Sequence, residues 1–154
     1  MNNEELKVLI FSVGNNYYAT DIMEIERILG YEEPTKLPDS PEFLEGVMNY
    51  EGNILPVISL NKKFAIESKE KSADTKIIVA KQNDYKTGIV VDLVLEVKDV
   101  KKENIEDAPQ IVGGISKRYI KGLIKIDKKI IIFLNLAAIL TEDERRQMHD
   151  LHDL

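Results

Sequence analysis

Residues 43–60 read Phe43-Leu44-Glu45-Gly46-Val47-Met48-Asn49-Tyr50-Glu51-Gly52-Asn53-Ile54-Leu55-Pro56-Val57-Ile58-Ser59-Leu60, and their pattern returns without a gap 76 residues later. The second copy reads Tyr119-Ile120-Lys121-Gly122-Leu123-Ile124-Lys125-Ile126-Asp127-Lys128-Lys129-Ile130-Ile131-Ile132-Phe133-Leu134-Asn135-Leu136. Each copy has an aromatic residue, an aliphatic residue and a glycine, then a strand, a polar turn and an apolar strand that ends in leucine. A hairpin repeated at half the chain length predicts two similar small β units, because two copies are too few for a solenoid or a propeller.

Composition favours a β-rich protein of this kind. The chain has 154 residues, of which 44% are hydrophobic and 6% aromatic, and it has no tryptophan. This length fits one domain, or two intimate subdomains that share a core. Isoleucine and valine are abundant, and β-branched residues favour strands. We therefore expect an all-β fold.

Composition also disfavours several classes of function. The absence of cysteine excludes disulfide bonds, thiol nucleophiles and cysteine-ligated metals. The net charge of −6 argues against a nucleic-acid partner, because such binding depends on a basic surface. The first residues lack the features of a signal peptide, and no apolar stretch approaches the ~20 residues that cross a bilayer. We expect a soluble, cytoplasmic protein.

The N-terminal region predicts a hairpin and then a helix. Residues 6–13 form one expected strand, and a second begins at Tyr17 after a Gly-Asn-Asn turn. Residues 21–29 carry apolar side chains with helical spacing, which predicts a short helix. Asp21 would cap its first turn and Gly30 would end it.

The later segments are simpler. Residues 65–76 are charged and predict a solvated bridge between the halves. Residues 76–81 and 88–92 predict two further strands. Residues 141–144 read Thr-Glu-Asp-Glu, a capping box that predicts a short polar helix at the C-terminus.

Residues that could carry chemistry are few. His149 and His152 stand three positions apart in a polar tail, a spacing that can ligate a metal on a helix. Histidines of such tails are usually solvent-exposed, so we expect no metal site. The sequence contains no phosphate-binding glycine loop, no dinucleotide fingerprint and no nucleophile elbow. We expect no cofactor and no enzymatic activity.

Several motifs together resemble one family. Residues 46–60 resemble the signature G-V-x-N-L-R-G-x-I-x-P-V-I-D-L of the bacterial chemotaxis coupling protein CheW. Residues 18–28 are similar to the family's Y-x-x-x-I-x-x-V-x-E-I, residues 88–97 to its G-x-x-V-D-x-V-x-x-V, and residues 119–122 to its Y-x-x-G. The order and spacing agree over about residues 6–140, so the resemblance covers nearly the whole chain.

The resemblance implies two five-stranded SH3-like β-barrels packed on a shared core, with short helices that include one at the C-terminus. Residues 1–154 would form a single CheW-like domain. One subdomain would span about residues 14–75 and the other about residues 76–134, completed by the N-terminal strand and the C-terminal segment.

The resemblance also implies a non-catalytic adaptor. Members of the family bind the cytoplasmic tip of chemoreceptors (methyl-accepting chemotaxis proteins) and the regulatory domain of the histidine kinase CheA. The protein would be cytoplasmic and recruited to membrane-associated receptor arrays, without inserting into the membrane and without binding nucleic acid.

The family pattern suggests two docking surfaces. The receptor groove, at the seam between the barrels, would be lined by the aliphatic residues Ile22, Ile25, Ile28, Val91 and Val94. The kinase surface, at the end of the first barrel, would be formed by Gly30, Tyr31, Leu37, Phe43 and Met48. The groove residues also fit ordinary core positions, and Phe43, whose repeat mate is Tyr119, also fits a residue that anchors a barrel.

Two residues depart from the family pattern in a reciprocal way. Glu51 stands where the family has arginine, and Arg27 stands where it has glutamate. We predict that Arg27 and Glu51 form an ion pair that holds the short helix against the first hairpin and orients a binding surface. An exposed pair contributes only ~0–1 kcal/mol, so its role would be orientation and not stability. The alternative is two unrelated surface changes.

Other functions remain alternatives. A CheW-like paralogue could scaffold a non-chemotactic receptor–kinase pathway, since Tyr50, Ser59 and Asn61 also replace the family's usual residues. A pair of SH3-like barrels could instead bind a small ligand or nucleic acid, which the acidic charge and the scarce aromatic residues disfavour. An enzyme would have to rely on carboxylates alone.

Overall fold

The computed structural model describes residues 5–67, 69–82, 85–109, 111–112 and 115–139, and strands dominate it. The strands are β1 (Glu5–Val13), β2 (Asn16–Asp21), β3 (Ile25–Gly30), β4 (Leu44–Tyr50), β5 (Asn53–Ser59), β6 (Lys76–Gln82), β7 (Tyr85–Val91), β8 (Leu93–Lys101), β9 (Ile105–Glu106), β10 (Ile111–Val112), β11 (Ile115–Ser116), β12 (Ile120–Ile126) and β13 (Lys129–Leu134). The helical turns are η1 (Ile22–Glu24), α1 (Leu60–Lys63), η2 (Lys102–Asn104), η3 (Lys117–Tyr119) and η4 (Leu136–Ala138).

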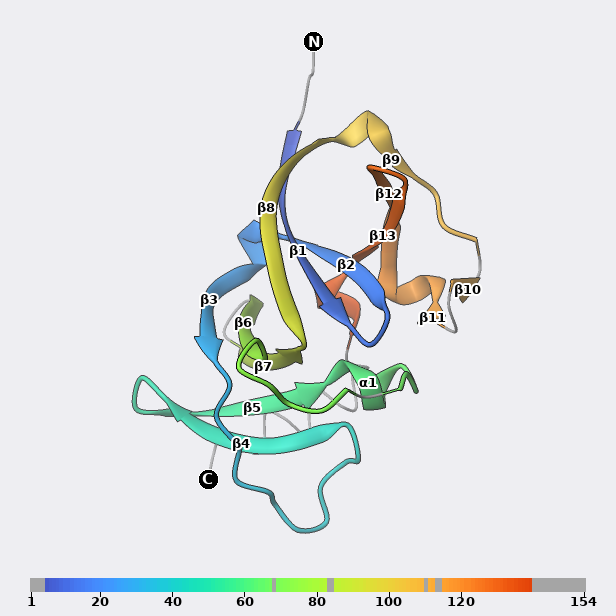
Figure 1. Cartoon of the computed structure of the whole chain (residues 1–154). Coiled ribbons are helices and arrows are strands. Elements are labelled where there is room, and N and C mark those ends of the chain that lie inside the picture. Colours follow the sequence, from blue (N-terminus) through green and yellow to red (C-terminus); the bar gives the residue numbers. More distant parts are fainter. Residues whose placement is uncertain (1–4, 68, 83–84, 110, 113–114, 140–154) are drawn as a thin grey trace.

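The strands form two main sheets, one above the other in Figure 1. The first barrel is the five-stranded sheet β3-β6-β7-β5-β4, and the second barrel is the six-stranded sheet β8-β1-β2-β13-β12-β9. The strands β10 and β11 pair separately. The predicted all-β class is confirmed, and the second sheet gains the two-residue strand β9 beyond the five strands expected.

The repeated sequence pattern is a repeated hairpin. β4–β5 and β12–β13 are the two copies, and each has a register shift immediately before its glycine. Gly46 has φ of +151°, and a Cβ on it would collide with the Thr35 backbone. A Cβ on Gly122 would come within 2.8 Å of the Glu106 carbonyl oxygen. Both glycines therefore allow another segment to cross closely over the hairpin.

The two halves of the chain exchange their leading hairpins. β1 and β2 join the second barrel, where β2 runs parallel to β13. β6 and β7 join the first barrel, where β7 runs parallel to β5. The expected subdomain boundary at residues 75 and 76 therefore does not separate the sheets, because residues 76–91 complete the first barrel. A boundary drawn along the sequence could not show this exchange.

A second internal repeat, with an offset of 69 residues, relates the other strands. Ile10 pairs with Ala19 between β1 and β2 as Val79 pairs with Gly88 between β6 and β7. β3 corresponds to β8, and both contain a bulge at the matching position, residue 26 in β3 and residue 95 in β8. The two repeats together make the barrels equivalent strand by strand.

The helix predicted over residues 21–29 is wrong. Asp21 does cap a turn, since its carboxylate accepts a hydrogen bond of 3.0 Å from the Met23 amide, but only η1 follows before β3 begins. The bulge at residue 26 explains the helical spacing of the apolar residues. It places Ile25 and Ile28 on one face of a strand, although a regular strand would place residues three apart on opposite faces.

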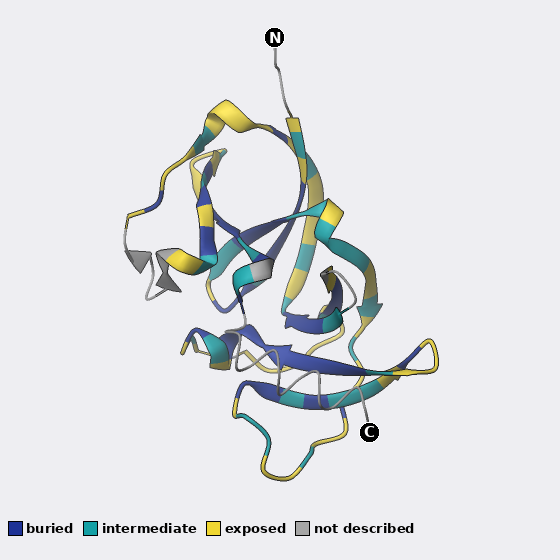
Figure 2. Ribbon diagram, turned by 180° about the vertical axis from the view of Figure 1, so that it is seen from behind, coloured by how far each residue is buried: buried dark blue, intermediate teal, exposed yellow. Residues whose placement is uncertain are grey.

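Four apolar clusters stabilise the fold. The largest, which we call the shared core, contains side chains from both sheets, including Leu9 and Phe11 of β1, Ile58 of β5, Ile78 of β6 and Leu134 of β13. Smaller clusters fill each barrel. Figure 2 shows buried residues along the inner strands and exposed residues at hairpin tips and connections. The barrels therefore depend on one common core.

In the part of the chain that the structure describes, no helix has the length and apolar character needed to cross a membrane. The helix predicted from residues 141–144 lies outside the described residues.

The exchange of hairpins predicts that the halves fold only together. Cleavage at a protease site engineered into the exposed residues 69–74 should leave both fragments in one native complex, because each fragment supplies strands to both sheets. Size-exclusion chromatography should show one species, and circular dichroism should show a single thermal transition. Residues 1–70 or 71–154 expressed alone should lack the native spectrum. A fragment that folds by itself would show that the halves are independent.

Candidate docking site

Exposed apolar side chains gather on the two segments that cross between the sheets. η1 and β3 lead from the second barrel to the first, and β8 leads back from the end of β7 (Figure 1). Six large hydrophobic residues are exposed among the described residues. Five of them lie on these two segments, namely Met23, Ile28, Leu93, Leu95 and Val97; the sixth is Ile130. Apolar groups gathered in this way mark a docking surface more readily than scattered ones do.

The predicted groove residues of β3 face the side of the shared core. Ile25 lies opposite Ala80 and Ile28 lies opposite Ile78 in the register with β6. Both partners belong to the shared core, and paired residues point to the same face of a sheet. Ile25 packs against the core and is half-buried, whereas Ile28 is 40% exposed. β3 therefore continues the apolar face of the core to the surface.

β8 presents the matching row. Val94 lies opposite Phe11 and Val97 lies opposite Leu9. Val94 packs against the shared core, while Val97 is 48% exposed. Val91 has no exposed surface, so this predicted groove residue is part of the core and is not available to a partner.

The groove residues predicted from the sequence did not include Val97, the exposed member of the β8 row. The 69-residue offset pairs Ile22 with Val91, Ile25 with Val94 and Ile28 with Val97, so it supplies the missing member. The hairpin repeat has a different offset, 76 residues, which hid this relation in the sequence.

A polar cluster lies beside these residues at the tip of the β4–β5 hairpin. Arg27 Nη2 is 3.6 Å from Glu51 Oε2, so the predicted pair is in contact. Lys86 Nζ, on β7, lies 3.7 Å from Glu51 Oε1 and 3.0 Å from Glu26 Oε2. Arg27 approaches Glu51 from a strand and not from the helix expected there. The side chains of Arg27 and Glu51 are about half exposed, so this pair adds little to stability.

A tyrosine anchors the same cluster. Tyr50 is 6% exposed, and its hydroxyl donates a hydrogen bond of 2.6 Å to Glu26. Burial, followed by the hydrogen bond to Glu26, raises the pKa of Tyr50 to about 12. The hydrogen bonds from Tyr50 and then Lys86 lower the pKa of the Glu26 carboxyl. At neutral pH the phenol therefore remains a donor and the carboxylate remains charged.

Polar contacts connect η1 to the second barrel. Glu24 Oε1 lies 3.5 Å from Lys121 Nζ on β12, and the Thr20 hydroxyl donates a bond of 3.4 Å to the same carboxylate. The first crossing segment thus contacts the second barrel through Glu24 and the first barrel through Glu26.

The residues expected at the kinase surface fall into two places. Tyr31 and Met48 pack together with Leu29 on a small cluster in the first barrel, and Gly30 is exposed beside them. Burial raises the pKa of the Tyr31 hydroxyl.

The other two predicted kinase residues, Leu37 and Phe43, pack against the shared core. Phe43 is only 9% exposed, and the Lys63 ammonium lies 5.0 Å from the centre of its ring. The structure therefore brings Tyr31 and Met48 together and assigns Phe43 mainly to the core.

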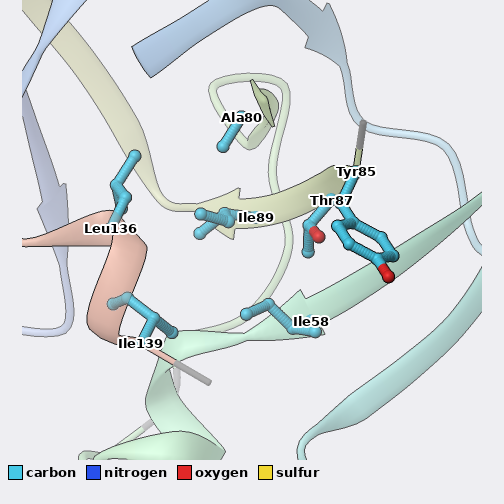
Figure 3. Close-up of a pocket in the computed structure, with 7 residues that line it drawn as sticks. All are labelled: Ile58, Ala80, Tyr85, Thr87, Ile89, Leu136 and Ile139. Carbon is cyan, nitrogen blue, oxygen red and sulfur yellow. The ribbon is translucent and has the colours of Figure 1, made fainter. Parts of the chain in front are cut away.

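The described residues offer little that could hold a ligand or a metal ion. The shared core contains an apolar cavity of ≈ 30 Å³. Its lining residues, drawn in Figure 3, are Ile58, Ala80, Tyr85, Thr87, Ile89, Leu136 and Ile139. This volume suits about one or two water molecules. No group of three or more His, Cys, Asp or Glu side chains that could bind a metal occurs in the described ranges. His149 and His152 lie outside them.

Comparison with known proteins identifies the family. Residues 7–144 match the CheW-like domain, and the chain therefore belongs to this family. It is 35% identical over 139 residues to the chemotaxis protein CheW of Thermotoga maritima, with 90% of each chain covered. It is 33% identical over 136 residues to CheW of Klebsiella aerogenes, covering 88% of this chain and 82% of that protein. The crystal structure of the scaffolding protein TtCheW from Thermoanaerobacter tengcongensis matches with a TM-score of 0.85 and 33% identity, covering 93% of this chain and 92% of that one.

Proposed function

We propose that this CheW-like protein is an adaptor that couples chemoreceptors to the histidine kinase CheA in chemotaxis signalling. Its relatives are named chemotaxis proteins, and the similar solved structure is described as a scaffolding protein. The observation that carries the proposal is the pair of apolar rows, Ile25 and Ile28 on β3 and Val94 and Val97 on β8, each of which continues the shared core and ends in an exposed residue. An adaptor needs surfaces for partners and no catalytic groups.

The receptor surface in this proposal is the apolar face of β3 and β8. A receptor tip is a helical hairpin, and amphipathic helices dock in apolar grooves with polar edges. Ile25 and Ile28 on one strand and Val94 and Val97 on the other supply the apolar rows. Arg27 and Glu51 supply polar groups at the edge.

The kinase surface in this proposal is the exposed rim of the first barrel at Gly30, Tyr31 and Met48. Tyr31 is half-buried, and Lys71 Nζ lies 5.4 Å above its ring. Tyrosines that are anchored in this way are frequent hot spots of interfaces. The two surfaces use different residues, so both partners can bind together and the protein can recruit the kinase to membrane-associated receptor arrays.

Single substitutions should separate the two surfaces. Ile28→Glu should weaken binding of a soluble receptor-tip fragment about tenfold or more, because it places a charge in the groove. It should leave binding of the CheA regulatory domain unchanged, while Tyr31→Ala should have the opposite pattern. Isothermal titration calorimetry with partners from the same organism provides the measurement, and Ile130→Glu, at a 56% exposed site away from both surfaces, is the control. If both variants lose the same partner, the two-surface arrangement is incorrect.

The exchanged ion pair favours a dedicated set of partners. Glu51 and Arg27 reverse the family's usual charges, and charges at an interface discriminate between partners. We propose that the pair orients the groove edge toward receptors of matching charge, in chemotaxis or in a related receptor–kinase pathway served by a paralogue.

Charge reversal tests this role of the pair. Arg27→Glu alone would gather three carboxylates near Lys86, and Glu51→Arg alone would gather three cations, so each should weaken receptor binding about two- to fivefold. The double variant restores one attractive pair and should bind within about twofold of the wild type. Calorimetric affinities for the four proteins form the cycle. If the losses of receptor-binding free energy of the two single variants simply add in the double variant, Arg27 and Glu51 do not act as an orienting pair.

A further inference from the structure

A side-chain contact joins the two outermost strands of the first barrel. β3 and β4 stand at opposite ends of the sheet order, yet the Tyr50 hydroxyl at the end of β4 donates to the Glu26 carboxylate on β3 at 2.6 Å. Lys86 Nζ of β7 approaches the same oxygen at 3.0 Å. This cluster, which we call the Glu26 clamp, closes the sheet at one end.

The clamp holds β3 where its backbone pairing is interrupted. Glu26 is the bulge residue that the register with β6 skips between Ile25 and Arg27. A bulged residue is unpaired, and β3 has only one neighbouring strand in the sheet. The same bulge brings Ile25 and Ile28 onto one face. The position of both isoleucines therefore depends on the residue that Tyr50 and Lys86 hold.

The second barrel is an internal comparison without this clamp. The equivalents of Glu26, Tyr50 and Lys86 there are Leu95, Ile126 and Tyr17. These three side chains contribute to the lining of a cavity of ≈ 70 Å³. The barrel fold itself thus does not require the clamp. The clamp on β3 must therefore have a role other than forming the barrel.

We propose that Glu26, held by Tyr50 and Lys86, is a positioning residue that fixes the β3 bulge and thereby sets the receptor groove. This inference rests on the proposed receptor binding. Tyr50 is 6% exposed, so a partner has little direct access to it. The hydrogen bond to Glu26 is the contact through which the Tyr50 hydroxyl acts on β3 and thereby on receptor affinity.

The test removes the hydroxyl with Tyr50→Phe and measures both partners by calorimetry. Receptor-tip affinity should fall about fivefold, a size typical of coupling through positions that do not contact the ligand, and affinity for the CheA regulatory domain should stay within about twofold. Tyr17→Phe, at the matching position of Lys86 in the second barrel, is the control and should change neither affinity. If receptor and kinase affinity fall together, the clamp is a general stabilising contact and the proposal is overturned.

A double-mutant cycle identifies the route. In an Ile28→Ala background, Tyr50→Phe should cost less than about twofold further in receptor affinity, because the positioned side chain is already truncated. Fully additive losses would overturn the proposal. Glu26→Gln provides a second variant of the clamp if Tyr50→Phe folds poorly. A wild-type protein that binds no receptor fragment would overturn the proposed function, whereas normal wild-type binding with an unaffected Tyr50→Phe variant would overturn only this inference.

Discussion

Burial of one apolar core between two sheets that exchange their leading hairpins is the constraint on which the structure depends. Leu9 and Phe11 come from the first half of the sequence but lie in the second barrel, and Ile78 comes from the second half but lies in the first. The chain must therefore cross twice between the sheets. The crossing segments run from the core to the surface. They therefore carry some apolar side chains that are packed in the core and others that are exposed.

The repeated bulge gives these crossings the apolar rows that we propose as a docking surface. In β3 and in β8, one skipped residue sets two aliphatic side chains, three positions apart, on the face that continues the shared core. The inner member of each pair packs against the core and the outer member is exposed. In the proposed function the same element joins fold and function, because the core fixes the strand and the exposed residues are the ones assigned to the partner. The two bulge residues differ in their side-chain contacts. Glu26 in β3 is bound by Tyr50 and Lys86, whereas Leu95 in β8 is an apolar residue.

Much of this organisation can be predicted from the sequence. The 76-residue repeat identifies the paired hairpins, and the reciprocal changes at Arg27 and Glu51 identify a contact that the structure shows at 3.6 Å. The bulge could not be predicted, because aliphatic residues at spacing three indicate a helix as readily as a bulged strand. Val97 was omitted for a different reason, because the 76-residue offset of the hairpins hid the 69-residue relation between β3 and β8. The burial of Val91 and the bond from Tyr50 to Glu26 depend on tertiary packing, which no local pattern records.

The central claim is that one molecule holds both partners at once. The most direct measurement is a calorimetric titration of a receptor-tip fragment into this protein, alone and then saturated with the CheA regulatory domain. We expect one receptor site in both titrations, with affinities that agree within about threefold, because partners that bind separate surfaces do not compete. Loss of receptor binding in the presence of the kinase domain would contradict simultaneous binding. Partners that compete for one surface of this protein could not be coupled by the protein.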